Sequence, residues 1–286
     1  MRSGRQAQFA IDSGELLAGT LPRAQTRLVQ AWIEIHQDEL SAGWQMGSTT
    51  NEVPMNYVFE PEAQVTVPIA GSNALFPVRR IYCVGRNYAA HAREMGFDPD
   101  REPPFFFCKP DNAIVVAPFG ETVSITYPSQ SSDFQHEIEL VVAIGKCGRD
   151  IAVERAREHV FGYAVGLDMT RRDLQLRARD KGRPWELGKA FDESAPIAPI
   201  HPVSAVGHPT QGAVWVQVDG VDRQRSDIAK LIWSVPEVIA NLSTFFELRP
   251  GDLIYTGTPE GVGKVERGQT MTGGIDGLGE LSVKVK

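Results

Sequence analysis

The sequence predicts an α+β fold, because short strand patterns recur along most of the chain while helical patterns are few and separate. The clearest strand patterns are the apolar runs 140–144 (LVVAI) and 160–167 (VFGYAVGL). The clearest helical pattern is 235–246 (VPEVIANLSTFF), which has Pro236 in its first turn. Many strands accompanied by a few helices are typical of the α+β class.

The composition is that of a soluble globular protein with ample material for a core, since 42% of the residues are hydrophobic and 23% are charged. The net charge of −7 argues against nucleic acids and anionic membranes as default partners. Cys83, Cys108 and Cys147 form no CxxC pair, so we expect a reducing compartment and no thiolate metal site. No signal-like or membrane-spanning apolar segment is present, and we therefore expect a cytoplasmic protein.

Residues 1–54 differ in pattern from the rest and are expected to form an N-terminal appendage without a catalytic role. Segment 24–40 (AQTRLVQAWIEIHQDEL) spaces its large apolar residues close to helical periodicity, which predicts an amphipathic helix. This piece resembles the tail of a small uncharacterised bacterial domain. Segment 41–54 (SAGWQMGSTTNEVP) has the composition of a linker. Met55 looks like a natural start, so we expect a second domain over 55–286.

The first part of this second domain contains short strand patterns and one helix. Asn87 is a suitable N-cap for a helix from about Tyr88 to Met95. His91 and Glu94 are three residues apart and therefore lie on one face of that helix. Such a face is either simply solvated, which is the commoner case, or part of a site. The expected strands lie at 57–67, 74–84 and 105–108 and within 114–128.

Glu137 and Glu139 lie two residues apart in the segment 134–145 (FQHEIELVVAIG), at the start of its apolar run. Alternate strand side chains point to opposite faces, so these two share a face, with Cβ atoms roughly 7 Å apart. Side by side at the edge of a core, two carboxylates repel each other and are costly to desolvate. A bound Mg²⁺, Mn²⁺ or Ca²⁺ would relieve both costs. The alternative is a half-solvated strand whose wet face carries two acids.

A third acid, Asp168, follows the apolar strand pattern of 160–167. It is either a turn or cap residue, or an oxygen ligand that meets the first two acids at a strand end. Helical spacing after it would place Arg172 and Gln175 on a common face nearby.

Other patterns in this region predict local structure. Segment 151–159 is expected to form a short helix. Thr170 and Asp173 have capping-box spacing and predict a helix that continues to about residue 180. Lys189 has large apolar neighbours, so we expect partial burial rather than full solvation.

The C-terminal part is predicted to be strands and turns with one helix. Segment 214–220 (VWVQVDG) predicts a half-buried strand that ends in a turn, and 253–256 predicts a strand that enters a glycine-rich loop, 256–263 (TGTPEGVG). The loop has neither the Lys-Ser/Thr ending of a P-loop nor GxGxxG spacing, which disfavours nucleotide binding.

Four motifs, in this order, resemble the fumarylacetoacetate hydrolase family over about residues 57–286. They are VGRNYAAHAREMG (84–96), HEIEL (136–140), GLDMTRRDLQ (166–175) and IYTGTPEGVG (254–263). Each is weak alone, but the ordered set is specific. The resemblance implies a mixed β-roll with flanking helices and a short helical lid, usually in a homodimer, and makes 55–286 the catalytic domain. Residues 1–54 have no counterpart in the family.

The same resemblance implies the roles of the site residues. It implies a divalent cation, Mg²⁺ or Mn²⁺ with Ca²⁺ as a further possibility, held by Glu137, Glu139 and Asp168. The positions that match the family's catalytic residues are His91, Glu94 and Lys189. The positions that match its substrate contacts are Arg172, Gln175 and Thr258, although the separate roles of Arg172 and Lys189 stay open.

The implied reaction is metal-dependent hydrolysis of a C–C bond in an acylpyruvate. The pyruvate half would leave as a metal-bound enolate, and His91, oriented by Glu94, would activate the attacking water. Within the resemblance, segments 76–96 (FPVRRIYCVGRNYAAHAREMG) and 103–110 (PPFFFCKP) favour fumarylpyruvate as the substrate. It would be cleaved to fumarate and pyruvate in aromatic catabolism. The alternatives are an oxaloacetate decarboxylase or keto-enol tautomerase on the same metal site, and a catalytically silent metal-binding or scaffold protein. We expect a small keto acid as the partner, with neither nucleic acid nor membrane.

Overall fold

The computed structural model describes residues 7–38, 57–94 and 102–286. The chain divides into two compact units, Met1–Glu62 and Ala63–Lys286. The expected linker at 41–54 and the C-terminal end of the helix expected at 88–95 lie outside the described residues. Each unit is described separately below.

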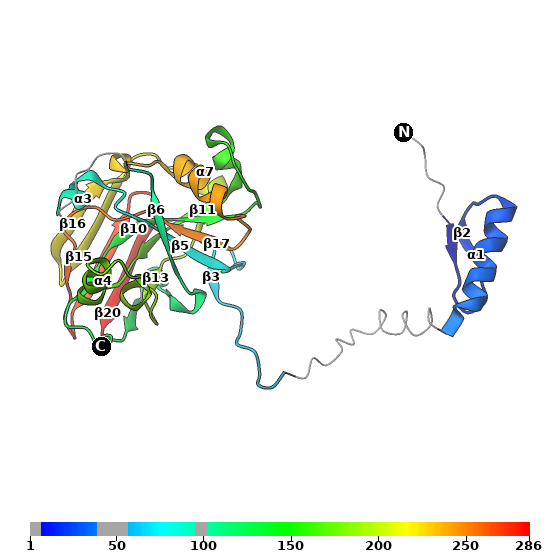
Figure 1. Ribbon diagram of the computed structural model, residues 1–286, viewed down its shortest axis with the longest axis horizontal. Helices are drawn as coiled ribbons and strands as arrows, with labels where there is room; N and C mark the ends of the chain where they lie inside the picture. Colours follow the sequence, from blue (N-terminus) through cyan, green and yellow to red (C-terminus); the bar gives the residue numbers. More distant parts are fainter. Residues whose placement is uncertain (1–6, 39–56, 95–101) are drawn as a thin grey trace. The chain divides into compact units, whose positions relative to one another are not determined.

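The first unit is a strand pair followed by a helix (Figure 1). Its strands are antiparallel, and a glutamine of the helix donates to the loop between them, with 3.1 Å from Gln30 Nε2 to the Gly14 carbonyl oxygen. The elements are β1 (Ala7–Phe9), β2 (Leu16–Gly19) and α1 (Arg23–Ile35). A helix is present within the segment predicted over 24–40, but it ends at Ile35.

The apolar face of α1 is largely uncovered within the described residues. Ile33 is buried, but the side chains of Leu28, Trp32 and Ile35 are 71%, 52% and 77% exposed. Helical periodicity shows that apolar residues share a face, but two short strands are too small to cover that face.

The second unit is built around an eight-stranded mixed sheet (Figure 1). Two neighbouring pairs, β5 with β17 and β7 with β13, are parallel, and the others are antiparallel. In sheet order the strands are β6 (Phe105–Lys109), β5 (Arg80–Gly85), β17 (Asp252–Tyr255), β10 (Ile138–Ile144), β11 (Val160–Leu167), β13 (Ala195–Ile197) and β7 (Ile114–Val116), with β14 (His201–Pro202) paired to β11.

Three smaller sheets complete the β structure. The five-stranded sheet has the order β16 (Val221–Asp227), β15 (Ala213–Val218), β19 (Thr270–Ile275), β20 (Gly279–Val285) and β8 (Thr122–Ile125). The three-stranded sheet has the order β12 (Thr170–Arg171), β9 (Phe134–His136) and β18 (Gly263–Lys264). The last is the pair β3 (Thr66–Pro68) and β4 (Leu75–Pro77).

The helices of this unit are short and lie around the sheets (Figure 1). They are α3 (Ala89–Glu94), α4 (Arg172–Arg179), α5 (Glu186–Lys189), α6 (Val203–Val206), α7 (Val235–Phe245) and the 3₁₀ turns η1 (Asp111–Ala113), η2 (Val153–His159) and η3 (Ile228–Lys230). The α+β class and the mixed-sheet architecture expected from the sequence are confirmed.

The side chains of the central strand β10 point alternately into two apolar clusters on opposite faces of the sheet. Ile138, Leu140 and Val142 point into the core shared with the five-stranded sheet. Val141 and Ala143 point to the opposite face, into a second cluster. Because side chains alternate, the acids at 137 and 139 fall on this second face.

Two sequence-based expectations about local structure are wrong. Thr170 does not cap a helix: it lies in β12, its hydroxyl donates to the Asp168 carbonyl oxygen at 3.1 Å, and α4 begins at Arg172 without a side-chain cap. Asn87 ties α3 to distant segments, with its side-chain amide bonded to the backbones of Trp233 and Thr256. In both cases the polar side chain, which local spacing predicts to be a helix cap, forms its hydrogen bonds with other parts of the fold instead.

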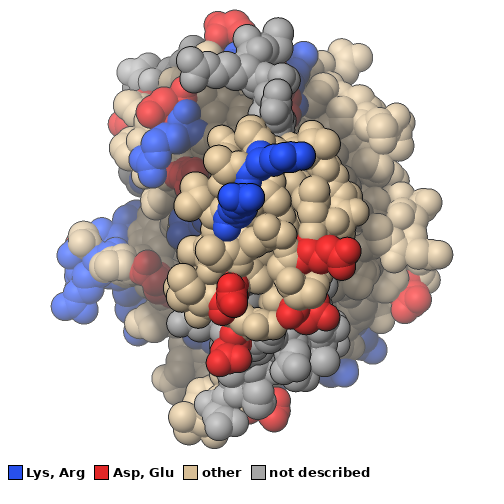
Figure 2. Space-filling model, turned by 90° about the vertical axis from the view of Figure 1, so that its right-hand side faces the viewer, with Lys and Arg blue, Asp and Glu red and all other residues tan. Residues whose placement is uncertain are grey.

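Surface charge is mixed on the face drawn in Figure 2, where basic and acidic side chains occur in small groups separated by uncharged residues. Among the described residues, no helix combines the length and the apolar character needed to cross a lipid bilayer.

Candidate active site

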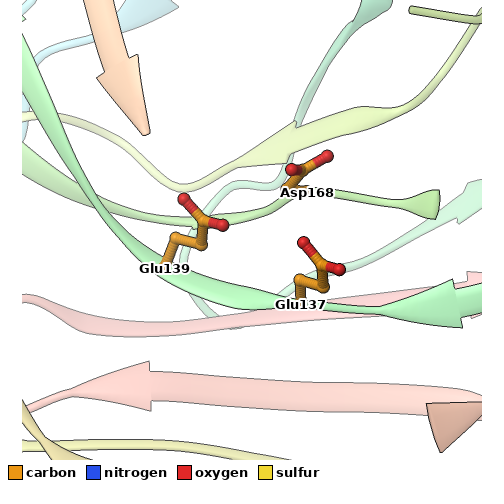
Figure 3. A group of neighbouring side chains, drawn as sticks. All are labelled: Glu137, Glu139 and Asp168. Carbon is orange, nitrogen blue, oxygen red and sulfur yellow. The ribbon is translucent and has the colours of Figure 1, made fainter. Parts of the chain in front are cut away.

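Three carboxylates converge on one face of the central sheet: Glu137, Glu139 and Asp168 (Figure 3). Each offers an oxygen atom within 4.8 Å of the others, and all three residues are buried. The strand register explains the convergence. Ile138 pairs with Leu167 in the antiparallel strands β10 and β11, and the Asp168 N–H donates to the Glu137 carbonyl oxygen at 2.8 Å. Asp168 therefore lies directly across from Glu137.

Three buried cations surround this cluster. Lys189 Nζ lies 2.7 Å from both Glu137 Oε2 and Asp168 Oδ2. Lys109 Nζ lies 2.9 Å from Asp168 Oδ1, and the Arg172 guanidinium donates to Glu137 Oε1. Both lysines and Arg172 are less than 5% exposed, so these pairs exist in a medium that screens charge weakly.

Glu137, which directly precedes β10, and Glu139, within β10, titrate in opposite directions. Burial alone would raise the pKa of Glu137, but Lys189 and Arg172 hold it well below its usual range. Burial raises the pKa of Glu139 well above its usual range, and the neighbouring Asp168 and Glu137 raise it further. Glu139 is thus the acid whose charge the protein compensates least.

Glu139 is held by the backbone of Gly257, and two glycines near it are tightly packed against other residues. The Gly257 N–H donates to Glu139 Oε2 at 2.7 Å, from a backbone with φ of +97° that L side chains rarely adopt. A Cβ on Gly257 would lie 2.7 Å from the Asn87 Cβ. Gly166 is the register partner of Glu139, and a Cβ there would lie 2.6 Å from Val141 Cγ2.

His91 and Glu94 form a pair at the same cavity. His91 Nδ1 lies 3.3 Å from Glu94 Oε2, and both Glu94 carboxylate oxygens accept from the Gly261 N–H at 3.2 Å. The hydrogen bond from His91 lowers the pKa of Glu94 despite its partial burial, which keeps this carboxylate ionised. The glycine-rich loop 256–263 therefore positions two acids through backbone N–H groups.

Arg172 and Gln175 lie on one face of α4, as helical spacing predicts, and are 2.5 Å apart from Nη1 to Oε1. Arg172 also donates to Gln135 Oε1 at 2.8 Å. Lys189 is 2% exposed, so it is more deeply buried than expected. Burial by itself lowers the pKa of Lys189, but the neighbouring carboxylates of Asp168 and Glu137 raise it by more. The pKa of Lys189 is therefore above its usual value, and the ammonium stays charged.

Thr258 is fixed by a buried glutamine that the sequence did not single out. Gln224 Nε2 donates to Thr258 Oγ1 at 2.8 Å and to the Pro259 carbonyl oxygen at 2.7 Å. Its Oε1 accepts from the Ile138 N–H at 3.2 Å and from His136 Nδ1 at 2.9 Å. The Thr258 hydroxyl in turn donates to the Ile138 carbonyl oxygen at 2.8 Å.

Most of these groups line one small cavity. Its wall includes His91, Glu137, Glu139, Arg172, Gln175, Lys189 and Thr258, together with Val84, Gly85, Arg86, Phe107, Leu176, Arg179 and Trp185. Asp168 and Glu94 lie behind this wall. Asp168 contacts Lys189, and Glu94 contacts His91.

The donor set fits a hard divalent cation. Carboxylate oxygens are the ligands that Mg²⁺ and Mn²⁺ prefer, and a dication beside Glu139 would offset both the burial and the repulsion that raise the pKa of this acid. The alternative of a wet strand face carrying two acids is wrong, because Glu137 and Glu139 are 5% and 2% exposed.

The sequence missed several residues of the site, and Lys109 is the clearest case. It directly follows the apolar run FFFC, so burial of its stem was a usable signal. No local sequence pattern predicted a site role for Arg86 and Arg179, which line the cavity. The same is true of Gln224, which contacts Thr258.

The comparisons with known proteins agree with this geometry. Residues 80–286 match the family model "Fumarylacetoacetate (FAA) hydrolase C-terminal", and residues 1–45 match a domain of unknown function, DUF4160. Fumarylpyruvate hydrolase of Ralstonia sp is 48% identical over 188 residues, which cover 66% of this chain and 95% of the relative. A mitochondrial oxaloacetate tautomerase of Arabidopsis thaliana is 42% identical over 207 residues, 72% of this chain and 91% of the relative.

A crystal structure of fumarylpyruvate hydrolase from Pseudomonas aeruginosa, in complex with Mn²⁺ and pyruvate, is 68% identical with a TM-score of 0.79. The match covers 80% of this chain and 99% of that one. The chain belongs to the fumarylacetoacetate hydrolase family.

Proposed function

We propose that this chain hydrolyses fumarylpyruvate to fumarate and pyruvate with the help of a bound Mn²⁺ or Mg²⁺. The observation that carries this proposal is a cluster of three buried carboxylates at one cavity, beside a histidine–glutamate pair and a buried lysine. The fumarylpyruvate hydrolases of Ralstonia and P. aeruginosa among the relatives support the choice of substrate.

Glu137, Glu139 and Asp168 would hold the cation. When bound, it would polarise the keto acid and stabilise the negative charge that develops on the pyruvate half of the substrate. The neighbouring ammonium of Lys189, which stays charged, would stabilise the oxyanion that forms at the attacked carbonyl.

His91 is the proposed general base. Its Nδ1 faces Glu94, which leaves Nε2 to take a proton from water. The water oxygen then bonds to the acyl carbonyl carbon, and the bond from this carbon to the methylene carbon breaks. The electron pair and a proton end on the methylene carbon, giving pyruvate, while the acyl half leaves as a carboxylate. Glu94 remains ionised and stabilises the imidazolium between these steps.

Arg172, Gln175 and Thr258 are the proposed contacts to the keto acid, since all three line the cavity beside the carboxylates. The finer expectations stay proposals of the same kind: a homodimer in the cytoplasm, acting in aromatic catabolism, with the catalytic domain over 55–286. Residues 1–54 are proposed to be an appendage without a catalytic role.

The test is an assay of purified protein with fumarylpyruvate and, separately, with oxaloacetate, each with Mn²⁺ and with excess chelator. We expect pyruvate release from fumarylpyruvate without CO₂, and its loss in chelator. The rival activity is oxaloacetate tautomerisation or decarboxylation, which the oxaloacetate tautomerase among the relatives favours. Faster turnover of oxaloacetate than of fumarylpyruvate would refute the hydrolase assignment.

A further inference from the structure

Helix α1 of the first unit has two different sides. On one side Ile33 is buried, and Gln30, three residues earlier, binds the loop between β1 and β2. The other side is apolar and exposed, and its residues are separated by four, three and four positions: Ala24, Leu28, Ala31 and Ile35. This alternation of three and four is the spacing of the a and d positions along which helices pair in coiled coils.

Two exposed charges flank this apolar face. Arg27 and Glu34 lie seven residues apart, directly before Leu28 and Ile35, and therefore occupy the same heptad position, g. In an antiparallel pair of identical helices the g positions of the two chains face each other. Arg27 of each chain then meets Glu34 of the other, and two-fold symmetry forms this contact twice. A parallel pair would instead place Arg27 beside Trp32, with no charge to match.

The charges of α1 oppose its own dipole. Its first turn contains Arg23 and no acid, its last turn contains Glu34 and no base, and Pro22 at the N-cap provides no side-chain cap. A helix dipole favours the reverse arrangement, and a helix of 13 residues is marginal by itself in water. An antiparallel partner brings its acidic end to the basic end of α1, so pairing corrects this mismatch.

We propose that the exposed face of α1 pairs with the same face of a second copy of this chain, in antiparallel orientation. The small side chains of Ala24 and Ala31 let the two backbones approach, and Leu28 and Ile35 bury their apolar surface between them. Residues 1–54 thereby connect two chains, and this role does not depend on the reaction proposed for the second unit.

The test follows hydrogen–deuterium exchange of the α1 amides in the full chain, by mass spectrometry, with peptides of β10 as the internal reference. The variants are Arg27→Glu, Glu34→Arg and the double variant that carries both changes. Each single variant places two pairs of like charges across the symmetric interface, and we expect it to exchange at least tenfold faster than the wild type. The double variant restores opposite charges and should exchange at least as slowly as the wild type. An equimolar mixture of the two single variants should recover protection for the same reason.

A lone helix predicts the opposite sign. Each single variant places a charge that the dipole of an unpaired α1 favours, so slower exchange in both would overturn the proposal. Faster exchange in the single variants without recovery in the double variant would also overturn it, because α1 would then pack on a different surface, of this chain or of another protein. An equal rate in all variants would exclude any role of these charges in covering the face, and with it the antiparallel pair.

Discussion

Replacing Glu139 by glutamine should stabilise the metal-free protein while removing its response to metal. In the metal-free protein this side chain is 2% exposed and lies beside Asp168 and Glu137, and burial together with these acids raises its pKa. Glutamine is nearly isosteric, is uncharged, and can still accept the Gly257 N–H through its carbonyl oxygen. Glu139→Gln therefore removes an electrostatic cost and keeps the packing.

The size of the effect is bounded by the proton that Glu139 must take up. The unfolded chain has the ordinary glutamate pKa of 4.5. At pH 7 the cost of protonating such a group is at most about 3.4 kcal/mol, from about 1.36 kcal/mol per pH unit. We expect a gain of about 1–3 kcal/mol, which for a unit of this size raises Tm by roughly 2–12 °C.

The dependence on pH has a definite sign. Because the folded pKa of Glu139 is raised, the wild type loses stability as pH rises above 4.5, up to the folded pKa. The Tm advantage of Glu139→Gln should therefore grow between pH 5 and pH 7 and vanish near pH 4.5. Thermal unfolding of chelator-treated wild type and variant, across this range, measures it.

Glu137→Gln, two residues away, is the matched control with the opposite expectation. The pKa of Glu137 is lowered by Lys189 and Arg172, so its stabilisation is present above 4.5 and is lost as pH falls. Removing its charge leaves two buried cations less compensated and should destabilise the metal-free protein at pH 7 by up to about 3–5 kcal/mol. Both variants should lose the rise in Tm that Mn²⁺ gives the wild type. Shifts of the same sign in metal-free Glu137→Gln and Glu139→Gln would refute the electrostatic reasoning.

Three further predictions concern the groups around the carboxylates. His91→Ala should lower kcat for fumarylpyruvate by about 10²–10⁴ with an unchanged Mn²⁺-induced rise in Tm, whereas Arg93→Ala on the exposed side of the same helix should keep kcat; an intact kcat in His91→Ala would exclude a proton-transfer role. Gln224→Met removes four buried hydrogen bonds and should destabilise the protein by roughly 2–5 kcal/mol in denaturant titration; a change below about 0.5 kcal/mol would contradict this account. Gly257→Ala should reduce Mn²⁺ affinity in a calorimetric titration, because the new Cβ clashes with Asn87 and displaces the N–H that holds the Glu139 carboxylate. Gly268→Ala is the control, since its φ is +90° but nothing lies within 4 Å of its Cβ, and it should keep the affinity. Equal losses of affinity in both variants would mean that the backbone φ alone matters.

Local periodicity predicted the elements that bear the site. The strand predicted over 160–167 is β11 residue for residue, and the helix predicted over 235–246 is α7 with one residue fewer. Alternation also predicted correctly that Glu137 and Glu139 share a face, although β9 ends at His136 and β10 begins only at Ile138. These features follow from the geometry of a single element, which the order of residues specifies directly.

Such local patterns do not predict which elements contact one another. Lys109, Gln224 and Gly257 reach the site from strands or loops far along the chain, and only the pairing of those strands brings them together. The sequence gives no register between β5, β10 and β17, and it was this register that decided which backbone N–H would meet Glu139. Thr170 shows the same limit, because its hydroxyl is bonded to Asp168 and Lys189 instead of to a helix end.

The charge of the cluster favours an anionic substrate of some kind. Three carboxylates face three cations, Lys109, Lys189 and Arg172, so the cluster is neutral once all three acids are ionised. A bound divalent cation would add two positive charges in a buried place, and an anionic keto acid would offset them. Oxaloacetate and fumarylpyruvate both satisfy this requirement.

Water activation separates the proposed hydrolysis from decarboxylation. Decarboxylation releases its product without a water nucleophile, so it has no use for a base fixed at the cavity wall. Here His91 is held by Glu94, and Glu94 is held in turn by the Gly261 N–H. An oriented histidine beside three buried carboxylates therefore supports the proposal of a hydrolytic reaction over a decarboxylation.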